Sequence, residues 1–237
     1  MMKHMQKTAC TLAVLATTSM STMAADSVDV RVIGTITPAA CTPTLSGGGV
    51  VDYGTMNPNT LSAAAYTVLP EHDVDFAITC DAPAKVAITA INGRPNTAAG
   101  VTEGAGQNAG VAPVQLFGRS ANAVGLGLDG SSKIGGYAVN VKTDTFTADS
   151  SSVSNIFVTG TPTTGTTWSA SPTGEIYHSG TVARYFSWAA TGTTVPAAFT
   201  TLAGKLGVQA YINHASELDL TKPVTLDGLT TIELVYL

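Results

Sequence analysis

Charged residues are scarce in this chain of 237 residues. They make up 11% of the sequence, with 11 Lys and Arg against 16 Asp and Glu, and no cluster of basic residues occurs. Proteins bind nucleic acid through patches of Lys and Arg that neutralise phosphates, so the composition argues against a nucleic-acid partner. The excess of acidic groups bears mainly on solubility.

Residues that build long helices are also sparse. Glu, Lys, Leu and Arg are few, whereas Thr, Ser, Gly and Ala dominate. Short β-branched runs alternate with Gly, Pro, Asn and Asp, which is typical of an all-β sandwich or barrel. No apolar run is long enough to cross a bilayer, so we expect no membrane span.

The first two dozen residues have the pattern of a secretory signal peptide. Lys3 and Lys7 give a basic start, a short apolar run covers residues 9–16, and small residues lead to Ala24 and Ala25. This order predicts cleavage after Ala24 or Ala25. We therefore expect an exported protein in which residues 1–24 are removed and residues 25–237 form a single β domain.

Cysteine is rare, with three residues in the chain. Cys10 lies in the predicted signal peptide, which leaves Cys41 and Cys80. An even pair in an exported protein predicts a disulfide. Two free thiols or half of a metal site are the alternative, but no CxxC pair and no His at ligand spacing accompanies these cysteines.

The sequence offers little for catalysis. Of the four histidines, His72, His178 and His214 lie outside the signal peptide, each in a different loop-like context, and no Ser occupies a G-x-S-x-G elbow. Glu71-His72-Asp73 and the cluster from His214 to Asp219 match no metal-loop spacing and are ordinary turn material. We expect no enzyme activity, no metal and no cofactor, although a distant carboxylate pair for glycoside hydrolysis is left open.

Alternating apolar residues mark the candidate strands. In residues 74–80, Phe76, Ile78 and Cys80 share the face that we expect to be buried, and residues 85–91 are expected to return as a hairpin partner. Residues 61–66 could form a helical turn, and residues 92–113 and 143–181 are expected to be long loops. The other expected strands cover 28–36, 50–56, 114–118, 124–128, 133–142, 153–158, 182–188, 206–212 and 224–237.

The last of these strands is apolar to its end. Ile232, Leu234 and Tyr236 alternate with Thr231, Glu233 and Val235. So apolar a strand invites aggregation unless a neighbour pairs with it. We expect it to be buried in its own sheet or to be handled by a partner that recognises strand edges.

Both tryptophans and three other aromatic residues gather in one region. Trp168 and Tyr177 are the better candidates for exposure and could stack on a sugar ring, whereas Tyr185, Phe186 and Trp188 fit the core of one strand. The simpler interpretation is that Tyr185 or Phe186, together with Trp188, are core residues of one strand and bind no ligand.

Three parts of the sequence together resemble the subunits of chaperone–usher fimbriae of Gram-negative bacteria. They are the alternating start that leads through Gly34-Thr-Ile36-Thr-Pro-Ala-Ala-Cys41, the strand Phe76-Ala-Ile78-Thr-Cys80, and an end with a penultimate tyrosine, Tyr236. The stretches 125–130, 134–137 and 226–237 look closer still to an uncharacterised fimbria-like branch of that family.

The resemblance implies an immunoglobulin-like sandwich that lacks its last strand. A periplasmic chaperone lends a strand to the open groove, an outer-membrane usher assembles the fibre, and the N-terminal extension of a neighbouring subunit then replaces the chaperone strand. On this chain the donor residues would be Val28, Val30 and Val32. The strand contacted by the chaperone or subunit would carry Ile232, Leu234, Tyr236 and Leu237.

The expected function is thus a structural fimbrial subunit that contributes to cell adhesion. It would pass through the periplasm to the fimbria at the cell surface. Two alternatives stay open: a tip adhesin that binds a glycan receptor through the loops of residues 143–188, and a self-sufficient secreted β domain, including a hydrolase. The resemblance also implies that a Cys41–Cys80 disulfide joins the early strands.

Overall fold

The structure is a computed structural model that describes residues 28–35 and 39–237. The predicted signal peptide, residues 1–24, lies outside the described residues. The chain divides between Thr37 and Pro38 into two units. In the first unit, residues 28–35 form no helix or strand, and Val28, Val30 and Val32 are exposed.

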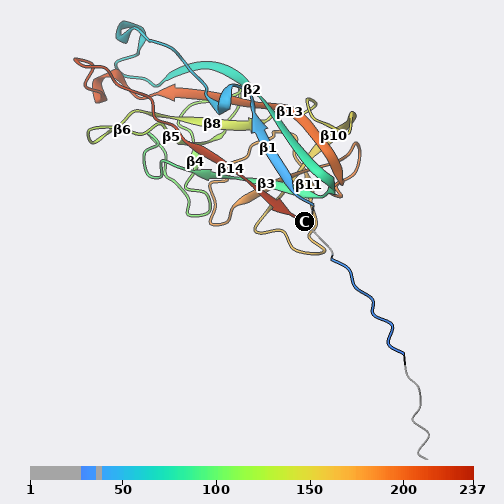
Figure 1. Cartoon of the computed structure of the whole chain (residues 1–237). Coiled ribbons are helices and arrows are strands. Elements are labelled where there is room, and N and C mark those ends of the chain that lie inside the picture. Colours follow the sequence, from blue (N-terminus) through green and yellow to red (C-terminus); the bar gives the residue numbers. More distant parts are fainter. Residues whose placement is uncertain (1–27, 36–38) are drawn as a thin grey trace, which may run out of the picture. The chain divides into compact units, whose positions relative to one another are not determined.

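The second unit is built from antiparallel β-strands, which confirms the all-β prediction (Figure 1). Three short 3-10 turns, Ser46–Gly49, Pro58–Thr60 and Ala215–Glu217, are the helical elements of the described residues. The strands are β1 (Cys41–Leu45), β2 (Thr67–Ala84), β3 (Val86–Asn92), β4 (Gly110–Val111), β5 (Asn122–Gly125), β6 (Leu128–Asp129), β7 (Ser132–Lys133), β8 (Gly135–Val141), β9 (Thr147–Ala148), β10 (Ser151–Thr159), β11 (Ser169–Ala170), β12 (Arg184–Ala190), β13 (Phe199–Ile212) and β14 (Thr230–Tyr236).

Two groups of strands can be distinguished within one continuous sheet. In the first group β13 lies between β2 and β8, β1 extends the group beyond β2, and β5 extends it beyond β8. In the second group the order is β14-β3-β12-β10. The groups are joined because β10 pairs with β12 over most of its length and with β9 at its start, while β9 also pairs with β13.

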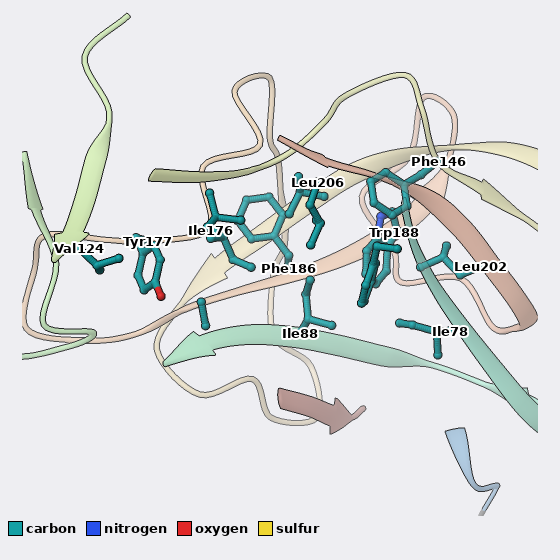
Figure 2. Close-up of a cluster of buried hydrophobic side chains, with 14 of the residues drawn as sticks. Ile78, Ile88, Val124, Phe146, Ile176, Tyr177, Phe186, Trp188, Leu202 and Leu206 are labelled. Atoms are coloured by element: carbon teal, nitrogen blue, oxygen red, sulfur yellow. The ribbon is translucent and has the colours of Figure 1, made fainter. Parts of the chain in front are cut away.

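The main core contains side chains from both groups. Ile78 of β2 and Leu202 of β13 belong to the same buried cluster as Ile88 of β3 and Trp188 of β12 (Figure 2). Trp188 lies at the centre of aromatic contacts and its ring centroid is 5.3 Å from that of Phe146. Along residues 74–80 of β2, buried and less buried positions alternate as the sequence pattern predicted, whereas β3 is buried at nearly every position.

The disulfide predicted from the sequence is present. Cys41 and Cys80 are bonded, and they face each other in the register of β1 and β2. Phe76, Ile78 and Cys80 are all buried, as expected for residues 74–80. The bond joins the start of β1 to the last third of β2, the longest of the described strands.

The hairpin expected between residues 74–80 and 85–91 is wrong. Lys85 alone separates β2 from β3, and a β-hairpin normally needs a loop of at least two residues. The chain instead crosses from one group of strands to the other, where β3 pairs with β14 along its length and with β12 at Ile88.

Three further local predictions are wrong. Residues 50–56 form no strand, and residues 61–66 form bends without a helical turn. Residues 114–118 do not form a strand either, because Phe117 and Gly118 both have positive φ angles, 54° and 69°, which end an extended run.

The long middle segments are packed onto the sheets. Ala99, Leu116 and Tyr211 belong to a second buried cluster, in which residues from 99–123 meet β8 and β13. Residues 143–181 contribute Phe146, Ile176 and other buried side chains to the core. These segments are therefore structural parts of the second unit.

Candidate functional site

The most distinctive feature of the structure is the edge of β14. One edge of this strand pairs with β3 in full register, from Thr230 opposite Asn92 to Tyr236 opposite Val86. No strand in the described residues pairs with its other edge. A strand edge with unpaired backbone groups can accept another strand.

An apolar groove of about 870 Å³ lies beside this edge. Its deepest residues include Tyr137 and Val139 of β8 and Leu206 of β13, which belong to the main core. One rim is formed by residues 48–58, which follow β1, and the other by residues 218–232, which lead into β14. The groove therefore reaches side chains of the main core, although these are themselves buried.

The two rims form no strand ladder over most of their length. Val224, Leu226 and Ile232 are half-buried and pack against the core, whereas Thr225 and Glu233 point outward. The alternation predicted for residues 224–237 is thus present, but ladder pairing begins only at Thr230. Residues before Thr230 have no partner strand because β3 ends at Asn92.

Specific contacts hold each rim in place. On the first rim, the Tyr53 hydroxyl donates to the carbonyl of Val208 at 3.5 Å, and burial raises the pKa of Tyr53 to about 12. On the second rim, Asp227 pairs with Arg94 through two hydrogen bonds of 2.7 and 2.8 Å, which holds the pKa of Asp227 below its usual value. Neither rim therefore depends on a neighbouring strand to keep its position.

A cluster of three hydroxyl groups lies where β14 begins. The Tyr137 and Tyr177 hydroxyls contact Thr230 Oγ1 at 2.6 and 2.8 Å. Burial raises the pKa of Tyr137 to about 12, and burial also raises the pKa of Tyr177. The Tyr137 ring also fills the space next to Gly228, where a Cβ atom would lie 2.7 Å from it. The groove is narrow at this point.

The other end of β14 is tied to the start of β1. The backbone N–H of Cys41 donates to the Tyr236 hydroxyl at 2.7 Å, and the N–H of Leu237 donates to the carbonyl of Lys85 at 3.0 Å. Because the disulfide fixes Cys41 against Cys80, this contact joins the two groups of strands at one end of the groove.

Comparison with known proteins places this chain in a family. YhcF, an uncharacterised protein of Escherichia coli K12, is 30% identical over 233 residues, which cover 92% of this chain and 94% of YhcF. This chain belongs to the YhcF family. GltF of the same organism is 29% identical over 246 residues, with 97% of both chains covered.

A family model described as "Protein of unknown function (DUF1120)" matches residues 30–138 of this YhcF-family chain. The matched range includes residues 30–35 of the exposed arm (residues 28–35), Cys41 and Cys80, and the strands β1 to β7. No solved structure matches the chain. None of these descriptions mentions a fimbria, so the resemblance to fimbrial subunits supports a proposal and no more.

The predicted contact residues of this YhcF-family chain lie on β14 or directly after it. Ile232 and Leu234 are half-buried and pack on the core, while Tyr236 and Leu237 are 52% and 45% exposed at the end of the strand. Ile232 is a lining residue of the groove itself. The predicted donor residues Val28, Val30 and Val32 are 87–94% exposed, and they belong to the separate first unit. The roles of both sets stay predictions.

The predicted exposure of Trp168 and Tyr177 is wrong. Trp168 is 6% exposed and packs with Ile156 and Ala189, and Tyr177 is fully buried in the main core (Figure 2). A sugar ring has no access to either face in this arrangement. The local sequence did not reveal this burial because both residues lie outside the long alternating strands.

The three histidines have separate surroundings. His72 contacts Tyr53, His214 contacts Tyr66, and His178 lies within hydrogen-bond distance of its own loop at Val182. In the parts of the chain that the structure describes, no group of three or more His, Cys, Asp or Glu could hold a metal ion. The helices of the same residues include none that is long and apolar enough to cross a membrane.

Sequence reasoning missed the groove and the hydroxyl cluster. Tyr137 and Thr230 are 93 residues apart, and nothing in their local sequence connects them. Val224 and Leu226 were visible as part of an alternating run. The alternating pattern does not show whether these residues have a neighbouring strand, so their unpaired position beside the groove could not be predicted.

Proposed function

We propose that this chain is a non-enzymatic structural subunit of a surface fimbria, assembled by a chaperone–usher pathway through donor-strand complementation. The observation that carries the proposal is the unpaired edge of β14 beside an apolar groove that reaches the core. An immunoglobulin-like sandwich that lacks one strand accounts for both features. The groove then occupies the position of the missing strand.

The geometry suits the addition of one extended strand. Backbone groups along residues 230–236 are available on one side, and alternate side chains of an incoming strand would point at Val139, Leu206 and the other apolar lining residues. Strand addition of this kind takes its affinity from backbone hydrogen bonds and its specificity from alternate side chains. Seven residues of strand span roughly 23 Å, which matches the length of β14.

The exposed arm supplies a segment of the right chemistry. Val28, Val30 and Val32 alternate with Asp29 and Arg31 in the sequence, and all three valines are exposed to solvent. β-branched residues with a two-residue period favour strand formation. In the proposal, a periplasmic chaperone fills the groove first, an outer-membrane usher mediates the exchange, and the arm of a neighbouring subunit is the final occupant.

A peptide experiment tests the proposal. The exported chain is purified, and its unfolding is followed with and without a synthetic peptide of residues 26–37. At a peptide concentration of 100 times Kd, filling the groove should stabilise the fold by about 2.7 kcal/mol. The matched control is the same peptide with Val28, Val30 and Val32 replaced by Asp, which should give no stabilisation.

Two results would argue against the proposal. One is a soluble, cooperatively unfolding monomer whose stability is the same with either peptide, which would favour a self-sufficient secreted β domain. The other is equal stabilisation by the valine and aspartate peptides, because the apolar groove would then not be the site of binding. The glycan-binding alternative has lost its basis, since Trp168 and Tyr177 are buried.

A further inference from the structure

Two oppositely charged residues are in positions to align a docked arm. Arg31 lies between Val30 and Val32 in the sequence, so it would face away from the valines once the segment forms a strand. Glu233 lies between Ile232 and Leu234 on the outer face of β14. Both side chains are exposed, and neither has an ion-pair partner among the described residues. Side chains on the same face of paired strands meet directly across the ladder.

We propose that a second copy of this chain docks its arm antiparallel to β14, in the register that places Arg31 opposite Glu233. The inference rests on the proposed function, since it requires that the groove accept a strand. It adds that the neighbouring subunit is a second copy of this chain, and it adds the direction and the register of the docked arm. Every pairing between named strands of the described residues is antiparallel, and antiparallel ladders are slightly more stable per residue than parallel ones.

Two neighbouring registers, shifted by two residues in either direction, also keep the valines facing the groove. The charged residues distinguish the proposed register from these two. A shift of two residues in one direction places Asp29 opposite Glu233, which brings like charges together. The opposite shift places Ile33 there, which leaves both charges without a partner. Opposite charges across a ladder stabilise it and like charges destabilise it, so Arg31 against Glu233 is the favoured arrangement.

The inward residues fit the same register. Val32 comes opposite Ile232, which lines the groove, and Val30 comes opposite Leu234, which packs against the main core. Gly34 comes opposite Thr230, where the Tyr137 ring narrows the groove. The position with no side chain thus meets the place with the least room.

Charge exchange in full-length chains tests the inference. R31E and E233R should each weaken the self-association of the exported protein by about 3- to 30-fold, and the double variant should return to within about twofold of the wild type. Self-association is measured by sedimentation velocity over a range of concentrations. D29K is the matched control, because residue 29 faces Val235 in this register and its charge should have little effect.

Disulfide trapping tests the register independently. Chains carrying R31C are mixed with chains carrying E233C, and the yield of crosslinked dimer is compared with D29C or I33C in place of R31C. Directly opposite residues have Cα atoms about 4.5–5.5 Å apart, which suits a disulfide, whereas a shift of two residues adds about 7 Å. The R31C pair should give the highest yield.

The outcomes distinguish the inference from the proposed function. If V30D abolishes self-association but charge exchange has no effect, or if D29C or I33C gives the highest crosslinking yield, the register is overturned and the groove proposal stands. If wild-type chains do not self-associate and no pair crosslinks, a second copy is not the occupant. If, in addition, the peptide of residues 26–37 fails to stabilise the chain, the proposed function fails as well.

Discussion

Gln107 joins three separate parts of the chain through one buried side chain, and its removal should be among the most damaging single changes. The side chain is 4% exposed. Its Nε2 donates to the carbonyls of Ala90 and Ile176 at 3.0 and 3.3 Å, and its Oε1 accepts from the N–H groups of His178 and Arg184 at 2.9 and 3.0 Å. A neutral amide has two donor hydrogens and two lone pairs on its oxygen, so all its hydrogen-bonding positions are used.

The expected cost of Gln107→Leu follows from these contacts. Leucine is of similar size but leaves four buried backbone groups without this partner. With about 0.5–1.5 kcal/mol for each hydrogen bond, the free energy of unfolding should fall by about 4 kcal/mol. Since domains are stable by roughly 5–15 kcal/mol, the change should be large in a urea denaturation curve.

Gln115→Leu is the matched control, because Gln115 is exposed and the chemical change is the same. Its effect should stay within about 0.5 kcal/mol. If Gln107→Leu costs less than about 1 kcal/mol, or no more than the control, the backbone groups around it must find other partners easily. The reasoning that this network holds the middle segment on the sheets would then be refuted.

Three other changes have defined outcomes. Replacing Cys41 and Cys80 by Ser should lower the free energy of unfolding by about 4 kcal/mol, because the disulfide joins residues that are 39 positions apart in the sequence. In a denaturation series, reduced wild-type protein should have the same stability as the variant. Trp168→Ala should cost about 3–5 kcal/mol in the same assay, and a cost near zero would contradict the burial of this ring. Burial raises the pKa values of Tyr137 and Tyr177 in the folded state, so their contribution to stability is fully present below the ordinary tyrosine pKa of about 10. Stability should fall as the pH rises above that value, because the unfolded chain loses these protons first. The phenolate absorbance of these two tyrosines should then increase in the same pH range in which the protein unfolds. If all tyrosines lose their protons while the protein stays folded, the prediction is contradicted.

The extended runs were predictable because alternation is a local property. Phe76, Ile78 and Cys80 identified part of β2, and the runs around β8, β10, β12 and β13 were recognised in the same way. The disulfide was predictable because an exported chain with two remaining cysteines has one way to pair them. In each case the evidence lay in a short stretch of sequence or in a simple count.

Pairing partners were not predictable, because they depend on which strands become neighbours in space. Residues 50–56 alternate as well as many true strands do, yet they form the rim of a groove without a ladder. β3 follows β2 after a single residue and still pairs with β14, whose partner residues lie about 140 positions further along the chain. Local pattern carries no information on such distant pairings.

The sequence alone determined that this is a β protein with a stapled start and an apolar final strand, since composition and side-chain period decide those features. The tertiary structure decided that the final strand has one paired edge and one unpaired edge, and that the space beside it is apolar. It also decided that Trp168 and Tyr177 belong to the core. The physical reason is that burial and edge exposure are set by which surfaces meet after folding, and the chain brings Val86 and Tyr236 together across 150 residues to set them.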